Sequence, residues 1–342
     1  MANKSDEIIK KELLDVGSVG DLKIRVFPGG SREDQKHWAD GGLSFGNDEV
    51  MYGSCDGAWY RAGSWKDPLS GRVSDVTPVL ALEGTLALER GSSGNAQYQR
   101  FFHALGAVLS GVVGVYYLKP GKDALRYDLP QAALNVSEAH GVDYLIVSDL
   151  DEVHALLEAL AEGNESKYQQ VAERIKKDMA HYFTDMLDKK FGKDIEQYFV
   201  SRSIVRLPKA NIKYLAGNYR NFTESSQRGG HIVLGEFLLA KYMLKEPFFF
   251  LLPRLEATDI ERLDASNKKE WQVLRSDKAG KLIILDDLVG VSADLHRKIL
   301  SLKNESLGGS AKGGRAKVLW NEYMKELIDG IRSGSIALRN ER

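Results

Sequence analysis

Apolar residues recur along the first half of the chain in two alternating periods, which predict helices and strands in turn. Helical spacing marks residues 6–14, 95–110 and 129–138. Short apolar runs bounded by turn residues predict strands at residues 21–27, 47–60, 76–88, 112–118 and 142–147. Residues 62–72 have turn chemistry, which predicts a hairpin connection. The alternation of strands and helices predicts an α/β fold with a mixed β-sheet flanked by helices.

The second half of the chain predicts more helix than strand. Residues 149–199 are highly charged with helical periodicity, and residues 231–244 and 317–332 predict two further helices. Only residues 248–252 and 281–285 predict strands there, while residues 307–317 form a basic, glycine-rich stretch that predicts a loop. We therefore expect a largely helical C-terminal half.

Composition excludes several classes of protein. With 43% hydrophobic and 28% charged residues, the chain is of average globular character, so disorder is not expected. Its longest apolar stretches are interrupted by Gly, Lys or Glu, and its first residues lack a signal-peptide pattern. The single cysteine excludes an intrachain disulfide and a multi-cysteine zinc site. We expect a cytoplasmic protein with no membrane partner.

The net charge of −1 hides a segregation of charge along the chain. Residues 130–165 carry eight acidic residues and no Lys or Arg, whereas residues 201–245 carry eight Lys or Arg against two acidic residues. Such asymmetry indicates a polyanion partner. Solvated faces that happen to be charged in blocks are the alternative explanation.

Two acidic residues fall on neighbouring predicted strands, where their side chains can share a metal ion. Asp56 precedes a glycine, and Glu83 follows in the next, strongly apolar strand. Because side chains alternate between the faces of a strand, Glu83 and Thr85 project to one face. Carboxylate oxygens are the ligands that Mg²⁺ prefers, and the ion would activate water and stabilise charge on a phosphodiester. For each acid alone, a structural explanation stays open: a salt bridge for Glu83 and a turn for Asp56.

Four sequence stretches follow one another between residues 52 and 118: CDGAWY, TPVLALEGTLAL, RGSSGNAQYQRFFHALGAVLSG and VVGVYYL. This succession resembles the PD-(D/E)xK core of type II restriction endonucleases, in its EcoRI-like arrangement. The resemblance implies a restriction-endonuclease-like core, a Mg²⁺ ion held by Asp56 and Glu83, and double-stranded DNA as the substrate. Thr85 would be the third catalytic residue and would orient the attacking water.

Two positions depart from the motif of that family. Cys55 stands where proline is usual, at a position that binds no metal. Thr85 stands where the family has a lysine that helps to activate water, and a neutral hydroxyl cannot supply its positive charge. Lys66, in the predicted loop, or a second metal ion would then substitute, and Glu89 is a further candidate ligand on the face of Glu83.

A stretch rich in glycine and serine, residues 90–95, follows the strand of Glu83 and runs into the predicted helix. Unpaired backbone N–H groups at a helix N-terminus can hold a phosphate, and amide and guanidinium side chains can contact base edges. The predicted DNA contacts here are Arg90, Ser92, Ser93, Asn95, Gln97 and Arg100. The alternative is a plain loop in which Ser93 or Asn95 caps the helix.

A second candidate DNA-binding segment, residues 218–231, lies in the centre of the basic region. It interleaves aromatic residues with Arg, Gln and Asn, the residue types that read guanine and adenine edges. The predicted DNA contacts in this segment are Arg220, Gln227, Arg228 and His231. Nothing in the sequence selects a recognition site.

Together these features predict a Mg²⁺-dependent, sequence-specific double-stranded DNA endonuclease of the type II restriction class. Residues 1–200 would form the nuclease core with a helical extension, and residues 201–342 the DNA-recognition and helical region, unless the chain forms one domain. A homodimer is expected, because palindromic sites match two-fold protein symmetry.

Two other functions stay open. Asp149-Leu150-Asp151 follows a predicted strand, and an Asp-x-Asp motif in that position is how nucleotide-sugar glycosyltransferases hold a metal ion. In a structural interpretation, the same acids open a charged helix, where they favour the N-terminal dipole. The second possibility, suggested by Thr85, is a DNA-binding protein that keeps the nuclease fold and has lost catalysis.

Overall fold

The computed structural model describes most of the chain: residues 4–26, 44–46, 51–86, 92–121, 124–207, 211–217, 227–266, 268–305 and 311–339. The fold is mixed α/β, with mixed sheets flanked by helices and a largely helical C-terminal half, as the sequence predicts. The chain divides into two compact units, Met1–Met186 and Leu187–Arg342, where the sequence predicts a boundary after residue 200. Within the described ranges, no helix is both long and apolar enough to cross a membrane.

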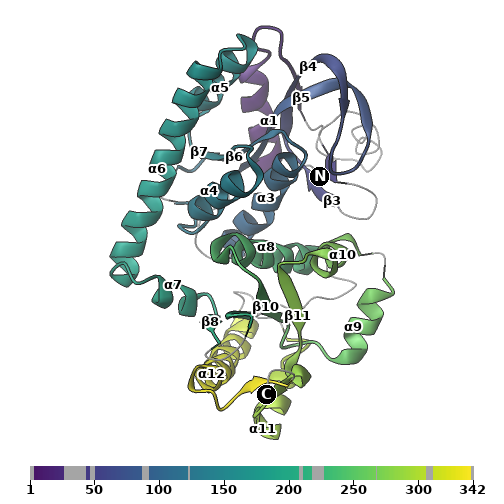
Figure 1. Ribbon diagram of the computed structural model, residues 1–342, viewed down its shortest axis with the longest axis vertical. Coiled ribbons are helices and arrows are strands. Elements are labelled where there is room, and N and C mark those ends of the chain that lie inside the picture. The colour runs from purple at the N-terminus through teal and green to yellow at the C-terminus, as the bar shows by residue number, and fades with distance from the viewer. Residues whose placement is uncertain are drawn as a thin grey trace. The chain divides into compact units, whose positions relative to one another are not determined.

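The first unit is built on a five-stranded sheet with the order β1-β4-β5-β6-β7 (Figure 1). Its strands are β1 (Lys23–Val26), β4 (Gly57–Lys66), β5 (Val73–Thr85), β6 (Val113–Leu118) and β7 (Tyr144–Val147). Strands β1, β4 and β5 pair antiparallel, whereas β5, β6 and β7 pair parallel through helical connections. A separate two-stranded sheet pairs β2 (Ser44–Gly46) with β3 (Met51–Ser54).

Helices cover both faces of this sheet. They are α1 (Lys4–Val16), α3 (Ser92–Leu109), α4 (Leu129–His140), α5 (Leu150–Ala161) and α6 (Glu165–Phe191). Two glycines let helices approach the strands closely. A Cβ on Gly84 would meet the Ile9 side chain of α1 at 2.6 Å, and one on Gly114 would meet the Ala104 carbonyl of α3 at 2.5 Å. Since Glu83 and Gly84 point to opposite faces of β5, Glu83 faces α3.

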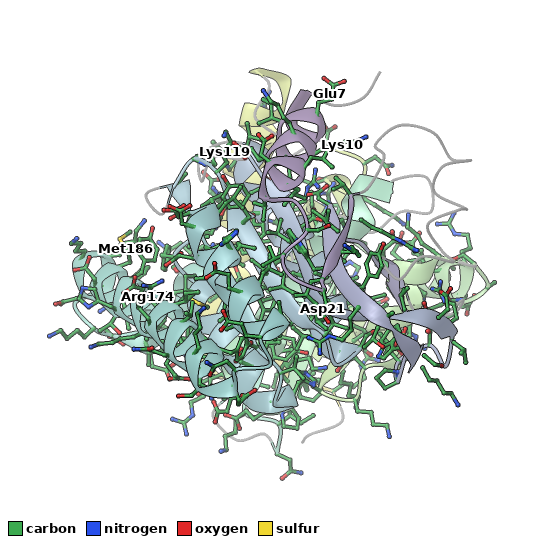
Figure 2. All side chains as sticks on the ribbon, turned by 90° about the horizontal axis from the view of Figure 1, so that it is seen from above. Glu7, Lys10, Asp21, Lys119, Arg174 and Met186 are labelled. Carbon is green, nitrogen blue, oxygen red and sulfur yellow. The ribbon has the colours of Figure 1, made fainter. Side chains whose placement is uncertain are left out.

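Helix α1 is anchored to the end of β6 by a small polar cluster. Lys119 forms an ion pair with Glu12 of α1, and the Tyr117 hydroxyl donates to the second Glu12 oxygen at 3.2 Å. Lys119 is labelled beside α1 in Figure 2. Ile9 and Leu13 are buried on the opposite side of the same helix from its exposed residues, so α1 is fixed by both apolar packing and charge.

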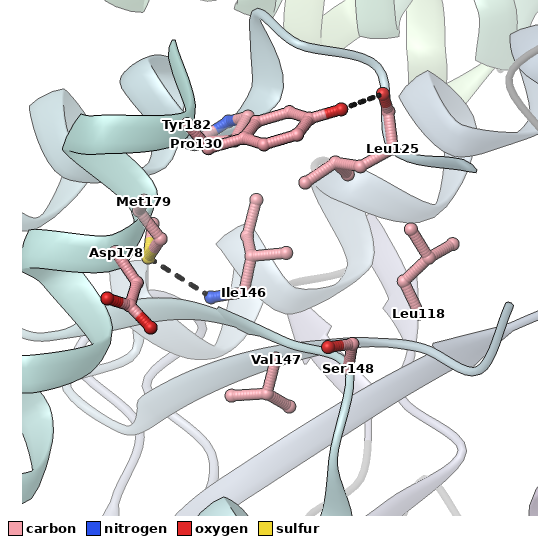
Figure 3. Close-up of a pocket in the computed structure, with 9 residues that line it drawn as sticks. All are labelled: Leu118, Leu125, Pro130, Ile146, Val147, Ser148, Asp178, Met179 and Tyr182. Carbon is pink, nitrogen blue, oxygen red and sulfur yellow. Dashed lines mark hydrogen bonds between the residues drawn. The ribbon is translucent and has the colours of Figure 1, made fainter. Parts of the chain in front are cut away.

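Side chains of α6 cover the outer edge of β7 (Figure 3). The backbone N–H of Ile146 donates to the Met179 sulfur at 3.4 Å, and the Tyr182 hydroxyl donates to the Leu125 carbonyl at 3.2 Å. Because β7 is at the edge of the sheet, this N–H has no neighbouring strand to bind, and the sulfur takes that place. A small pocket here is lined by Leu118, Leu125, Pro130, Ile146, Val147, Ser148, Asp178, Met179 and Tyr182.

The second unit contains a four-stranded sheet with the order β11-β10-β9-β8, drawn from teal to green in Figure 1. Its strands are β8 (Ile204–Arg206), β9 (Tyr214–Gly217), β10 (Phe248–Leu251) and β11 (Gly280–Ile283). Its helices are α7 (Ile195–Ser201), α8 (Gln227–Leu244), α9 (Ala257–Asp264), α10 (Lys269–Ser276), α11 (Ala293–Ser301) and α12 (Ala311–Ser333). A 3-10 turn, Leu285–Asp287, and the short strands β12 (Leu288–Val289) and β13 (Ala337–Leu338) complete it.

The interior of the second unit is apolar on both faces of this sheet. Phe237 of α8 packs against Phe248 and Phe250 of β10, with ring centroids 5.3 and 5.2 Å apart. On the opposite face, Phe249 and Leu251 belong to a buried cluster that includes side chains of α12. Aromatic contacts of this kind hold a helix and a sheet together without polar groups.

The two units repeat one succession of elements, although the sequence shows no internal repeat. In the first unit, β4 and β5 pair antiparallel, α3 connects β5 to its parallel neighbour β6, and α4 connects β6 to parallel β7. In the second, β8 and β9 pair antiparallel, α8 connects β9 to parallel β10, and α9 with α10 connects β10 to parallel β11. Sheet order follows chain order in both.

Two predicted loops are wrong in part. Residues 62–72 predict a turn, but β4 continues to Lys66 and β5 begins at Val73, so only a short connection remains. This part of the hairpin is mostly exposed, and polar residues on an exposed strand resemble a loop in composition. Residues 307–317 predict a loop, but α12 begins at Ala311. The apolar stripe further along α12 outweighs the low helix propensity of Gly313 and Gly314.

Candidate active site

Asp56 lies where the chain turns from β3 into β4. The sequence predicts one strand over residues 47–60, but the strand is interrupted at Cys55 and Asp56. The Asp56 Oδ2 atom accepts a hydrogen bond from the Gly84 backbone N–H at 2.8 Å, which ties the start of β4 to the end of β5. Its side chain is 14% exposed, so the carboxylate borders the solvent.

Glu83 is fully buried on β5, beside Tyr116 of the parallel strand β6. Its Oε1 atom accepts a hydrogen bond from Nη1 of Arg100 at 2.6 Å and lies 3.2 Å from Nδ1 of His103. Arg100 and His103 are three residues apart on α3, so they share one face of that helix. The other carboxylate oxygen, Oε2, has no hydrogen-bond partner in the described part of the chain.

The two carboxylates converge on one guanidinium group. The Arg100 Nη1 atom that binds Glu83 lies 4.0 Å from Oδ2 of Asp56. Three residues distant in sequence therefore meet at the carboxyl end of β5: one from the turn between β3 and β4, one from β5 and one from α3. The structure brings together the two predicted metal ligands and adds a cation that the sequence interpretation assigned to DNA contact.

The charges of this cluster follow from burial and from its neighbours. Burial raises the pKa of Glu83, but His103 and Arg100 outweigh it and hold that pKa below its ordinary value of 4.5. Burial, together with the charges of Glu83 and Asp56, raises the pKa of the Cys55 thiol well above its ordinary value. At neutral pH, Glu83 is therefore an anion, and Cys55 is an uncharged thiol next to Asp56.

Thr85 is buried two residues beyond Glu83 and on the same face of β5, where it interacts with Tyr116. It carries no charge. Lys66, the predicted substitute, is at the opposite end of β4 from Asp56, roughly 30 Å away at the usual rise along a strand. It cannot supply a cation to this cluster, so that expectation is wrong. Glu89 lies outside the described residues.

The predicted phosphate-binding stretch is only partly described. Arg90 is outside the described residues, and the backbones of Ser92, Ser93 and Asn95 form the first turn of α3, which begins at Ser92. Gln97 is buried, donating to the Ala124 carbonyl at 2.7 Å and accepting from the Arg126 N–H at 2.9 Å. Gln97 and Arg100 are therefore bound within the protein in this structure.

The second predicted DNA-binding segment lies at the start of α8. Arg220 is outside the described residues, while Gln227, Arg228 and His231 form the first turns of the helix. Their backbones lie at a helix N-terminus, where unpaired N–H groups can bind an anion. Whether they contact DNA stays a prediction.

The Asp-x-Asp motif of the alternative function has a structural use here. The Asp149 carboxylate accepts a hydrogen bond from the Asp151 backbone N–H at 2.9 Å and caps α5, and Asp151 lies in the first turn. Both acids are thus placed where a helix N-terminus favours negative charge. The pocket that reaches neighbouring Ser148 is mostly apolar (Figure 3), which does not favour a nucleotide sugar.

The residues of the Asp56–Glu83 cluster fit a single divalent cation. Asp56 is at the solvent boundary, and the Oε2 atom of Glu83 is a buried anionic oxygen with no hydrogen-bond donor among the described residues, as a metal ligand would be. The described residues include no group of three or more His, Cys, Asp or Glu side chains placed to hold a metal. Remaining ligands would come from water and substrate, as is usual for Mg²⁺.

Arg100 and His103 are the site residues whose position sequence reasoning missed. The available signal was their spacing of three residues on a helix that follows the strand of Glu83 directly. Comparisons of the chain with protein-family models, curated proteins and solved structures find no match. The likeness to restriction endonucleases therefore rests on the quoted sequence stretches.

Proposed function

We propose that this protein is a Mg²⁺-dependent endonuclease that cuts double-stranded DNA at specific sites. The observation that carries the proposal is the meeting of Asp56 and Glu83, both within 4.0 Å of one Arg100 nitrogen, with a buried Glu83 oxygen left without a donor among the described residues. Two carboxylates at the end of adjacent strands suit a hard cation and a phosphodiester.

In the proposed reaction, a water oxygen bonds to phosphorus while the bond from phosphorus to one sugar oxygen breaks. The water loses a proton to solvent, and the leaving alkoxide gains one from it. Asp56 and Glu83 would hold Mg²⁺, which when bound lowers the pKa of water and neutralises charge on the phosphate. Within the protein, the Gly84 N–H orients Asp56, and His103 and Arg100 keep Glu83 ionised.

The experiment is incubation of the purified protein with plasmid DNA and Mg²⁺, followed by gel electrophoresis. We expect discrete fragments from the wild-type protein and a loss of at least about 10³-fold in rate for Asp56→Asn and for Glu83→Gln. Asp21→Asn, an exposed acid away from the cluster, is the matched control and should cut at the wild-type rate. Cutting at the wild-type rate by both Asp56→Asn and Glu83→Gln would show that these acids are not the active site.

A second candidate function is sequence-specific DNA binding without cleavage. Thr85 favours it, because position 85 cannot provide a positive charge to the site. In that case, a labelled DNA library would be retained and shifted by the protein with no fragments at any Mg²⁺ concentration. Binding that weakens steeply with salt is expected in either case.

The proposal includes a homodimer, since two copies related by a two-fold axis would cut both strands of a palindromic site. Sedimentation equilibrium with and without cognate DNA tests this. A monomer in both conditions would limit the protein to single-strand cuts or sequential cuts.

A further inference from the structure

Among the described residues, the Arg100 guanidinium lies close to both carboxylates of the site. The Arg100 guanidinium reaches from α3 to Glu83 at 2.6 Å and to Asp56 at 4.0 Å, while 23% of its side chain is exposed. Glu83 itself has no exposed surface. Arg100 therefore lies between a buried anion and the solvent from which a DNA phosphate would approach.

Two other residues considered for this positive charge, Thr85 and Lys66, do not supply it. Thr85, the nearest residue along β5 on that face, is uncharged, and Lys66 is at the far end of β4. A guanidinium group is always protonated, and its planar fork of N–H donors can bind two phosphate oxygens at once. His103 packs beside the same Glu83 oxygen and restricts where that oxygen can accept a bond.

We propose that Arg100 is a catalytic residue that supplies, from helix α3, the positive charge that meets the phosphodiester at the Asp56–Glu83 site. This inference rests on the proposed endonuclease function. A purely structural ion pair, which only compensates the burial of Glu83, is the competing explanation. The two explanations differ in whether the charge of residue 100 affects the cleavage rate and the cation affinity of a protein that is still folded.

The test compares Arg100→Lys, which keeps the charge, with Arg100→Gln, which keeps a hydrogen-bond donor without charge. We expect Arg100→Gln to lower kcat about 10²- to 10³-fold with KM changed less than about threefold, and Arg100→Lys to retain at least about a tenth of kcat. Arg61→Gln is the matched control, since Arg61 is on β4 and its guanidinium donates to the Leu160 carbonyl of α5. Its cleavage rate should be unchanged.

A second readout does not depend on cleavage. Calcium binding is measured by titration calorimetry without DNA, in the wild-type protein and in Arg100→Gln. Removing a positive charge close to two carboxylates should tighten Ca²⁺ binding at least about tenfold. Unchanged Ca²⁺ affinity would mean that the charge of Arg100 does not act on the cation position between the two carboxylates.

Circular dichroism establishes that each variant is folded. If Arg100→Gln does not fold, the double variant Thr85→Lys/Arg100→Gln decides, because it restores one cation beside Glu83; cleavage within about a hundredfold of wild type is expected. Cleavage by folded Arg100→Gln within threefold of wild type, unchanged Ca²⁺ affinity, or an inactive folded double variant overturns the inference. If the wild-type protein cuts no DNA, the proposed function fails, and the inference fails with it.

Discussion

The two sheets share one order of elements, but the first buries a charged cluster under its crossover helix and the second buries aromatic side chains there. Between β5, β6 and α3, the first unit buries Glu83 with Arg100 and His103. Between β9, β10 and α8, the second unit buries three phenylalanines. Ala216 pairs with Phe250 in the second unit as Glu83 pairs with Tyr116 in the first, on the face of each sheet that meets its crossover helix. The common topology thus does not require a buried charge at this position of the sheet.

The second unit also contains a buried acid that shows what a structural carboxylate is like. Asp259 of α9 accepts the Glu256 backbone N–H at 2.9 Å and forms ion pairs with Arg262 and Lys303. Both of its oxygens are used, and it caps its own helix. Glu83 differs because one of its oxygens has no such partner within the described residues. An oxygen without a donor can accept a bond from a ligand, whereas both oxygens of Asp259 are already engaged within the protein.

The largest expected effect comes from moving the charge of the first unit into the second. Ala216→Glu would place a carboxylate at a buried position beside Phe250 and should lower the free energy of unfolding by about 4 kcal/mol. Urea denaturation measures it. Val318→Glu, at a position 57% exposed, is the control and should change stability by less than about 0.5 kcal/mol. A loss below about 1 kcal/mol for Ala216→Glu would mean that the interior of the second unit tolerates a buried carboxylate as the first unit does.

The next largest effect is expected from removing the aromatic contact between α8 and β10, which stands in the second unit where the first has its charged cluster. Phe237→Ala should destabilise the second unit by about 3 kcal/mol, because a buried ring is replaced by a cavity. Phe237→Leu keeps most of the volume and should lose only about 1 kcal/mol. Thermal unfolding followed by circular dichroism checks both, and equal losses would argue against ring packing as the cause.

Asp259→Asn should lower the free energy of unfolding by about 2 kcal/mol at pH 7, because charge-assisted hydrogen bonds are lost. Burial raises the pKa of Asp259, but Lys303 and the other partners hold it below the ordinary value of 3.8. Stability from a lowered acid pKa is present above the unfolded value and is lost as the pH falls through the folded one. The difference between variant and wild type should therefore shrink below about pH 4. A difference that does not change with pH would contradict this.

The smallest expected effect is the stabilisation of the protein by Mg²⁺, which should depend on Asp56 and not on Asp259. Mg²⁺ at about ten times its dissociation constant should raise the free energy of unfolding by about 1.4 kcal/mol in the wild-type protein and not in Asp56→Asn. Asp259→Asn is the matched control and should keep the gain. Stabilisation that survives in Asp56→Asn would move the metal away from the site.

Strands β5 and β6 of the first unit could be predicted because their apolar runs are long and lie between clear turn signals. The site could be predicted only in part. A single acid in the apolar run of β5 identifies Glu83, but its partner Arg100 is 17 residues further on. Their contact depends on how α3 is rotated on the sheet, which the buried stripe of Tyr98, Phe101 and Phe102 allows in more than one way.

The second unit was harder to predict for physical reasons. Its strands β8 and β9 have three and four residues, too few for a period of two to be distinguished from chance. The repeated topology leaves no trace in the sequence, because Glu83 and Ala216 need opposite surroundings. Pairing between strands far apart in sequence is set by packing of the whole unit, which no local pattern records.

The packing of α6 on the sheet depends on a side chain that can be oxidised, Met179. Its sulfur accepts the Ile146 N–H at the edge of the sheet, within a pocket of mostly apolar side chains. Oxidation to the sulfoxide would bring a polar oxygen into that pocket and change the shape of the side chain that holds α6 against β7. Oxidation of Met179 would therefore weaken the packing of α6 against β7, and a methionine sulfoxide reductase would reverse it.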